Sequence, residues 1–139
     1  MSRFTVQEAA YLREHFLGRL ATAGSSGKPH VVPVRYHFDP EQEVIKIGRR
    51  VLEGSGQERL YVRHLTANPQ AALVVDDVAD GQTWQPRGIL IKGTTVLHTE
   101  GGKVLGPGFG PKWVEVIPDF VTSWGIGAPA VPPTASDES

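Results

Sequence analysis

The sequence predicts a mainly β fold, a barrel of about six antiparallel strands with two short helices. Short β-prone runs alternate with turn residues from residue 20 onward. Helix-start patterns occur at only two places, near the beginning of the chain and in its middle. Because helices do not separate the strands one by one, a parallel α/β sheet is excluded and a barrel is favoured.

Composition limits the class of protein. The chain has 139 residues, 40% of them hydrophobic and 21% charged, with a formal net charge of -1. This is typical of one globular domain without a nucleic-acid partner. We expect a domain over residues 1–126 and a disordered tail over residues 127–139, which are rich in proline and small residues. With no signal-peptide pattern and no long apolar window, we expect a cytoplasmic protein without a membrane partner.

The first helix is expected over about residues 6–16. Thr5 and Glu8 form the T-x-x-E pattern of a capping box, and Gly18 ends the helical pattern. The β-prone runs that follow, separated by GSSGKP and DPEQ, predict a three-stranded antiparallel meander over residues 19–23, 30–38 and 43–50. Pro33 lies inside the middle run and cannot donate to a ladder, so this strand must have an edge or a bulge there.

The second helix is expected over about residues 56–66, because Ser55 and Glu58 repeat the capping pattern. The continuous apolar run AALVVDD at residues 71–77 predicts a strand that is buried on both faces, covered outside by a helix or a second subunit. Three more strands are then expected, namely residues 88–98 with a bend or bulge at Gly93, residues 113–117, and residues 119–125.

Several kinds of catalytic site have little support. There is no cysteine, which excludes disulfides, thiolate ligands and a thiol nucleophile. Asp76 and Asp77 are adjacent on a strand and point to opposite faces, so they do not form a carboxylate dyad. A metal site is not expected, because no two histidines have ligand spacing on one element; they are His15, His30, His37, His64 and His98.

A basic segment in the middle of the chain indicates an anion site. The third strand ends in Gly48, Arg49 and Arg50, and the following helix carries Arg59 and Arg63 four residues apart. Helix N-termini and guanidinium groups both stabilise anions, so a phosphate-like group suits this place. A solvated basic face beside an ordinary helix is the alternative reading.

The middle strand of the meander offers a second binding feature. One of its faces carries His30, Val32, Val34, Tyr36 and Phe38, and the other carries Val31, Pro33, Arg35 and His37. Where Pro33 leaves a neighbouring backbone group unpaired, a flat heterocycle could bond to the strand edge. An irregular edge strand without a ligand is equally compatible with this pattern.

In their order and spacing, five blocks resemble the pyridoxamine 5'-phosphate oxidase-like split β-barrel superfamily, and within it the actinobacterial deazaflavin-dependent group. The blocks are HVVPV at residues 30–34, NPQAALVVDD at 68–77, WQPRGILIKG at 84–93, HTEGG at 98–102 and SWG at 123–125. The resemblance extends from Phe4 to Ile126 and implies an FMN-binding split barrel.

The resemblance further implies a homodimer that binds coenzyme F420, or alternatively FMN, between its two barrels. The ring would lie near His30, Pro33 and Val34, and the anionic tail would run toward the basic segment at Gly48, Arg49, Arg50, Arg59 and Arg63. One departure stands at Tyr61, where relatives often carry a lysine. A tyrosine can donate a hydrogen bond to phosphate but supplies no charge.

Trp84 precedes a strand in the segment WQPRG, and two readings are open for it. It could pack on the core, as aromatic residues near strands do. It could instead belong to a loop at the barrel rim that lies over the partner's cofactor, with Arg87 reaching a carboxylate or a cofactor carbonyl.

The expected activity is hydride transfer between the cofactor and a small unsaturated organic substrate. No catalytic residue is assigned, although Arg35, Tyr36 and His37 could supply a proton. One alternative is a non-catalytic protein that holds a flavin, deazaflavin, haem or lipid-like ligand in the same groove. A barrel that serves only for dimerisation is a further alternative.

Overall fold

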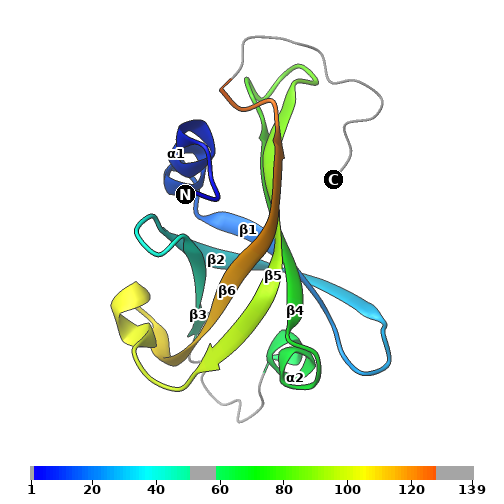
Figure 1. Cartoon of the computed structure of the whole chain (residues 1–139), viewed down its shortest axis with the longest axis vertical. Coiled ribbons are helices and arrows are strands. Elements are labelled where there is room, and N and C mark those ends of the chain that lie inside the picture. Colours follow the sequence, from blue (N-terminus) through cyan, green and yellow to red (C-terminus); the bar gives the residue numbers. More distant parts are fainter. Residues whose placement is uncertain (1, 51–58, 128–139) are drawn as a thin grey trace.

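The computed structural model describes residues 2–50 and 59–127. Six antiparallel strands form a closed barrel in the order β1-β2-β3-β6-β5-β4 (Figure 1). The predicted mainly β barrel is therefore confirmed. The elements are α1 (Val6–Glu14), β1 (Leu17–Ala23), β2 (Pro29–Asp39), β3 (Val44–Arg50), α2 (Leu60–Ala67), β4 (Gln70–Val78), β5 (Pro86–His98), the 3-10 turn η1 (Gly102–Leu105) and β6 (Phe109–Trp124).

Helix α1 begins at the predicted capping box. The Glu8 amide donates to the Thr5 hydroxyl at 3.0 Å, and the Thr5 amide donates to the Glu8 carboxylate at 2.9 Å. Glu8 also accepts a 2.6 Å hydrogen bond from the Ser123 hydroxyl, which ties the helix start to the end of β6. The helix ends at Glu14, two residues before the expected end, because β1 already begins at Leu17.

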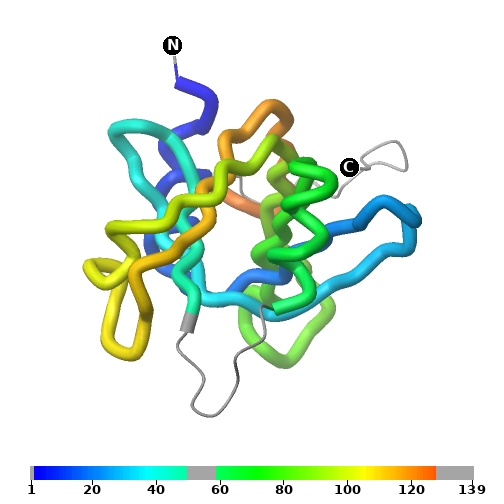
Figure 2. The backbone as a smooth tube through the Cα atoms, turned by 90° about the horizontal axis from the view of Figure 1, so that it is seen from below, coloured from blue at the N-terminus to red at the C-terminus, as the bar shows by residue number. Residues whose placement is uncertain are grey.

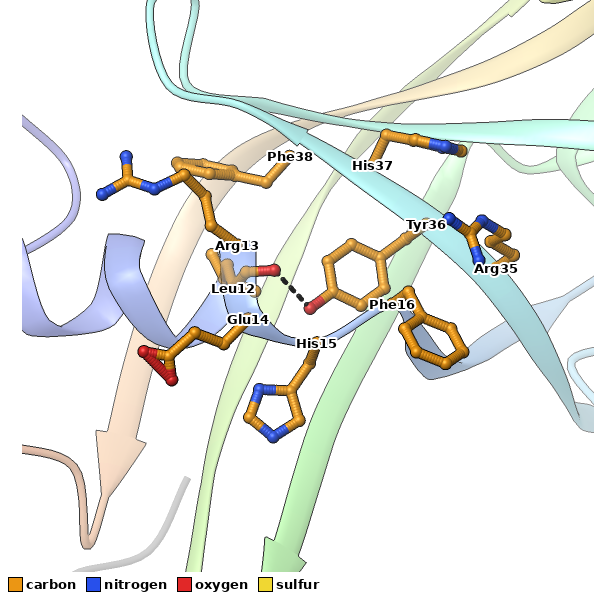
Figure 3. Close-up of a pocket in the computed structure, with 9 residues that line it drawn as sticks. All are labelled: Leu12, Arg13, Glu14, His15, Phe16, Arg35, Tyr36, His37 and Phe38. Atoms are coloured by element: carbon orange, nitrogen blue, oxygen red, sulfur yellow. Dashed lines mark hydrogen bonds between the residues drawn. The ribbon is translucent and has the colours of Figure 1, made fainter. Parts of the chain in front are cut away.

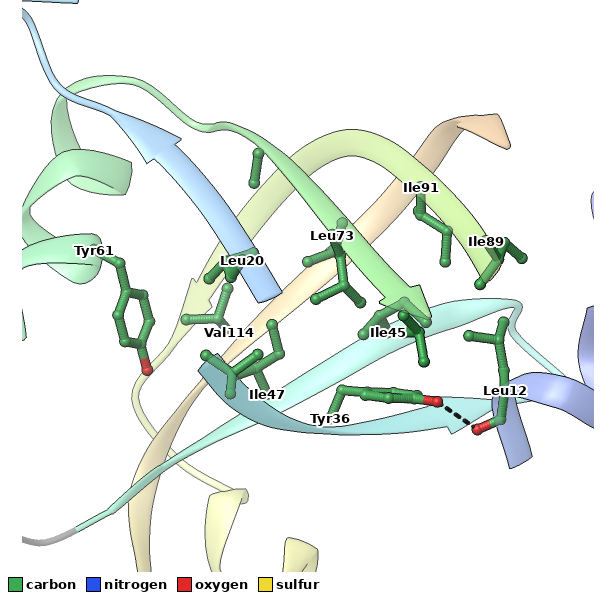
Figure 4. Close-up of a cluster of buried hydrophobic side chains, with 14 of the residues drawn as sticks. Leu12, Leu20, Tyr36, Ile45, Ile47, Tyr61, Leu73, Ile89, Ile91 and Val114 are labelled. Atoms are coloured by element: carbon green, nitrogen blue, oxygen red, sulfur yellow. Dashed lines mark hydrogen bonds between the residues drawn. The ribbon is translucent and has the colours of Figure 1, made fainter. Parts of the chain in front are cut away.

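The core fills the barrel with side chains from alternate positions of the strands (Figure 4). Burial of each large apolar side chain contributes roughly 1.5–3 kcal/mol. Tyr36 is fully buried among them, and its hydroxyl donates to the Leu12 carbonyl oxygen at 2.8 Å. This hydrogen bond joins α1 to the barrel wall. Helix α2 lies across the lower end of the barrel and inserts Tyr61, Val62 and Leu65 (Figure 1, Figure 2).

Strand β2 changes partner along its length. Its residues 29–35 pair with β1, whereas residues 36–39 pair with β3. Within the described residues, no strand pairs with the second edge of the segment 29–35. The edge that Pro33 predicted in this strand is confirmed.

The expected start of the second helix needs correction. Helix α2 begins at Leu60 rather than near Gly56, because Arg59 has a non-helical backbone and forms the N-cap. The predicted cap residues Ser55 and Glu58 lie outside the described residues.

None of the helices in the described ranges has the length and apolarity needed to cross a membrane.

Strand β4 is buried on one face only. Leu73 and Val75 are fully buried, but Ala72 and Val74 are half-buried on the outer face. Burial on both faces is therefore wrong for a single chain, because neighbouring strands cover the outer side chains only in part. The expected cover by a second subunit stays a prediction.

The last two expected strands are one strand, β6. A register shift between Lys92 and Gly93 places Gly93 opposite Pro118. This bulge accommodates the proline, so the strand continues past it. A Cβ atom at Gly93 would lie 2.2 Å from the Ile117 carbonyl oxygen. Only glycine therefore fits at the bulge, which was predicted at this residue.

Candidate functional site

The unpaired edge of β2 is the first component of the site. Val31 and Pro33 lie on the outer face, and Val31 is 65% exposed. Val34 is buried in the core, and His30 is half-buried on the same inward face. Among the three residues predicted to contact a ring, Pro33 therefore has its side chain on the outer face, whereas the side chains of His30 and Val34 point inward.

The end of β3 and the start of α2 bring part of the predicted basic segment together. Burial raises the pKa of Tyr61, and the positive charges of Arg49 and Arg59 act against this shift. Arg49 and Arg59 therefore both lie near the same phenol, although ten positions separate them in the sequence. Gly48 carries the Phe109 ring directly against its backbone, where a Cβ atom would lie 2.8 Å from the ring.

The other two arginines of the segment have different positions. Arg63 is exposed, and its amide donates to the Arg59 carbonyl oxygen at 3.3 Å, so the two residues lie one helical turn apart. The side chain of Arg50 lies outside the described part of the chain. In the described residues, no side-chain hydrogen bond caps the α2 N-terminus, and the Val62 amide donates to the Arg59 carbonyl oxygen at 3.0 Å.

A pair of histidines lies where α2 meets the barrel. The His64 Nδ1 atom is 3.1 Å from the Thr22 hydroxyl, and the His30 and His64 rings are perpendicular at 5.5 Å. The Gly24 backbone passes so close that a Cβ atom there would lie 2.9 Å from the His64 ring. These long-range contacts have no signal in the sequence, because they depend on how α2 closes the barrel end.

The β4–β5 loop carries an exposed tryptophan. Trp84 is 82% exposed, so the reading that it packs on the core is wrong. A role over the partner's cofactor stays a prediction. Arg87 reaches a carboxylate, as predicted, but it is Asp77 of the same chain, at 2.6 and 2.9 Å.

Asp77 holds several side chains together outside the barrel. Besides Arg87, it accepts a 2.9 Å hydrogen bond from the Tyr11 hydroxyl and lies 3.2 Å from the His15 ring. The hydrogen bonds from Arg87 hold the pKa of Asp77 well below its usual range, and those from Tyr11 and His15 act in the same direction. Asp76 points the other way and pairs with Arg19, so the two aspartates do not form a dyad.

A hollow of about 280 Å³ opens beside β2 at the end of α1 (Figure 3). It contains the three residues that could supply a proton, Arg35, Tyr36 and His37. Burial raises the pKa of Tyr36, whose hydroxyl is committed to Leu12, so Tyr36 serves the fold and not proton transfer. Burial and the nearby charge of Arg35 lower the pKa of His37, and the backbone of Leu105 and Lys46 acts against this shift. The Nδ1 atom of its ring is buried.

Comparison with known proteins places the chain in a family. Residues 4–106 match the family model described as Pyridoxamine 5'-phosphate oxidase. The 5a,11a-dehydrotetracycline/5a,11a-dehydrooxytetracycline reductase of Streptomyces rimosus is 36% identical over 123 residues, which cover 88% of this chain and 84% of the relative.

Solved structures agree on the fold. HupZ of Group A Streptococcus superposes with a TM-score of 0.64 at 18% identity, over 88% of this chain and 95% of the other. A FAD-binding protein of Mesorhizobium loti gives 0.61 at 17% identity, over 86% and 92% of the two chains. From the family match and the barrel topology together, the chain belongs to the pyridoxamine 5'-phosphate oxidase family of split β-barrel proteins.

Proposed function

We propose that this protein is a flavin-type oxidoreductase that binds coenzyme F420, or alternatively FMN, beside the unpaired edge of β2. The observation that supports this proposal best is that the edge, residues 29–35, ends close to the positively charged side chains of Arg49 on β3 and Arg59 at the start of α2. A planar ring that hydrogen-bonds to backbone groups and an anionic tail that needs arginines would together use both features.

The residues present suit such a cofactor. Pro33 and the backbone of the neighbouring β2 residues would contact the ring from one side. Arg49, Arg59 and Arg63 would neutralise the tail. The longer polyanionic tail of coenzyme F420 would use several arginines better than the single phosphate of FMN does.

The bound cofactor would supply the hydride, and the protein would orient it against the substrate and exclude water. His37 is the residue proposed to move a proton. The lowered pKa keeps its imidazole ring uncharged near neutral pH, so the ring can accept a proton. The substrate class is a small unsaturated molecule, in agreement with the relative named as a reductase of dehydrotetracyclines.

A homodimer is part of the proposal. The outer face formed by β1, β2 and β4 carries several apolar side chains beside the Arg19–Asp76 pair, with Leu17 and Val31 exposed and Val74 half-buried. A second copy would cover this face and bring its own Trp84 loop beside the cofactor.

A protein that holds the same ligand without turnover is the second candidate. The observation that favours it is Tyr61, which is buried and uncharged where relatives often carry a lysine. The Tyr61 hydroxyl therefore supplies no positive charge to the anionic tail of the cofactor. The arginines alone must neutralise that tail.

The experiment that separates these candidates begins with the absorption spectrum of the purified protein, and then titrates it with coenzyme F420 and with FMN. Reduced coenzyme F420 is next mixed with a panel of conjugated acceptors. Binding with turnover supports the oxidoreductase, binding without turnover across the panel supports the holding protein, and no binding of either cofactor overturns both.

A further inference from the structure

The hollow beside β2 exposes an aromatic ring in a fixed position. Phe16 is 58% exposed, although its carbonyl oxygen is held by a 2.9 Å hydrogen bond from the Tyr36 amide. The exposure is therefore built into the fold and does not come from a loose chain segment. The Arg35 guanidinium lies over this ring, 4.9 Å from its centroid.

Arg35 differs from two other arginines on the outside of the barrel. Arg19 is paired with Asp76 and Arg87 is paired with Asp77. Within residues 2–50 and 59–127, by contrast, no carboxylate forms an ion pair with Arg35. A stacked guanidinium that keeps its charge has its planar fork of donors available for an acidic oxygen.

His37 is the next outward residue along β2 and lines the same hollow. In Figure 3, Phe16, Arg35 and His37 lie on one side of Tyr36, and Arg13 and Glu14 lie on the other. The Nδ1 atom of His37 is buried, so this residue helps to shape the hollow but does not present that nitrogen to it. One end of the hollow thus combines an aromatic face and a guanidinium.

We infer that this end of the hollow binds the acidic end of a flat conjugated molecule, with Arg35 pairing to a carboxylate or ionised enol oxygen and Phe16 stacking on the adjoining ring. The volume of about 280 Å³ is slightly below the roughly 300–1,000 Å³ of common ligand pockets, so the hollow takes one end of a molecule. Arg35 is also the last residue of the unpaired β2 edge. The inference rests on the proposed function for one point, that the bound molecule is the substrate whose other end meets the cofactor ring.

The test uses two probes of the same shape, 2-naphthoate and its neutral counterpart 2-naphthamide. Each is titrated into the full-length protein without added cofactor, and binding is followed by calorimetry and by NMR shifts of the residues around Phe16. The wild type should prefer the naphthoate. Arg35→Met should weaken naphthoate binding at least tenfold and remove the preference, whereas Arg35→Lys should keep part of it. Phe16→Ala should weaken both probes by a similar factor.

Arg19→Met is the matched control, because Arg19 is an exposed arginine of the adjacent strand whose charge is already paired. Unchanged binding in this variant supports the inference, and a loss equal to that of Arg35→Met overturns it. Equal affinity of the wild type for both probes, or shifts confined to residues away from the hollow, also overturns it. Failure of the protein to bind coenzyme F420 or FMN would instead contradict the proposed cofactor and leave the naphthoate result standing.

Discussion

Asp77 and Arg87 face each other directly across strands β4 and β5, and two hydrogen bonds of 2.6 and 2.9 Å join the carboxylate to the guanidinium. The pair also receives the Tyr11 hydroxyl from α1. This arrangement fixes α1 against the barrel beside the hollow. It also assigns Arg87 to the structure of its own chain, so a contact with the cofactor would have to use the part of the guanidinium that Asp77 leaves open.

Asp77→Asn should lower the free energy of unfolding by about 1 kcal/mol at neutral pH, since the side chains are about one-third exposed and solvent screens the pair. The pKa of Asp77 is lowered in the folded protein, so its contribution is present above the ordinary aspartate value of about 3.9 and is lost as the pH falls toward the folded value. Urea titrations of both proteins at several pH values measure this. The difference between them should shrink in acid, and a difference that grows there would contradict the assignment. Asp76→Asn, in a more exposed pair, should change little.

Tyr36→Phe should destabilise the protein by about 1–3 kcal/mol, because the Leu12 carbonyl oxygen would lose its donor inside the protein. Chemical denaturation gives the size of the effect. The affinity for coenzyme F420 should remain within about twofold of the wild type. A large loss of affinity with unchanged stability would show that the hydroxyl serves the ligand instead.

Gly93→Ala should destabilise the barrel by more than about 2 kcal/mol, because the new Cβ atom would meet the Ile117 carbonyl oxygen at 2.2 Å. Gly81→Asn is the matched control, since that glycine has open space around it and asparagine tolerates its positive φ of 72°. Thermal unfolding should separate the two variants clearly. Equal melting temperatures would mean that the bulge relaxes without cost.

Arg49→Ala combined with Arg63→Ala should weaken coenzyme F420 binding at least tenfold, or about 1.4 kcal/mol, with little loss of stability. Fluorescence titration of the cofactor measures the affinity. Arg19→Ala, which removes a β1 charge that Asp76 already pairs, should leave the affinity unchanged. Unchanged affinity in the double variant would show that the anionic tail lies elsewhere.

Trp84→Ala should leave the free energy of unfolding of the isolated chain within about 0.5 kcal/mol, because the side chain is almost fully exposed. It should weaken the dimer or the cofactor complex, since a buried tryptophan contributes strongly to interfaces. Sedimentation velocity over a range of concentrations and cofactor titration give the two readouts. A large stability loss without either effect would contradict the interface role.

Much of the fold was predictable because local patterns report local structure. The capping box at Thr5 and Glu8 and the strand edge at Pro33 were both visible in the sequence, since each depends on backbone donors of neighbouring residues. The sequence did not show that the last two predicted strands form one strand. Pro118 looks like a strand break in the sequence, and only the structure shows that it lies opposite the bulge residue Gly93.

The candidate site was predictable only in part. The basic segment around Arg49 and Arg59 stood out because its residues are close in the sequence. The hollow could not be recognised in the sequence, because Phe16 follows a helix and Arg35 lies on a strand. Only the β1–β2 register brings these two side chains together. Arg87 likewise could not be assigned to Asp77 before the β4–β5 register was known.

The unpaired edge of β2 has a consequence for the behaviour of the protein in solution. A row of backbone groups that no strand of the described residues pairs, beside exposed Val31, is a template on which a strand of another molecule can add, as in aggregation. Pro33 removes one donor from this row and so hinders such addition. A ligand that occupies the edge would complete the protection, and we therefore expect the protein to stay monodisperse for longer at high concentration when its cofactor is present.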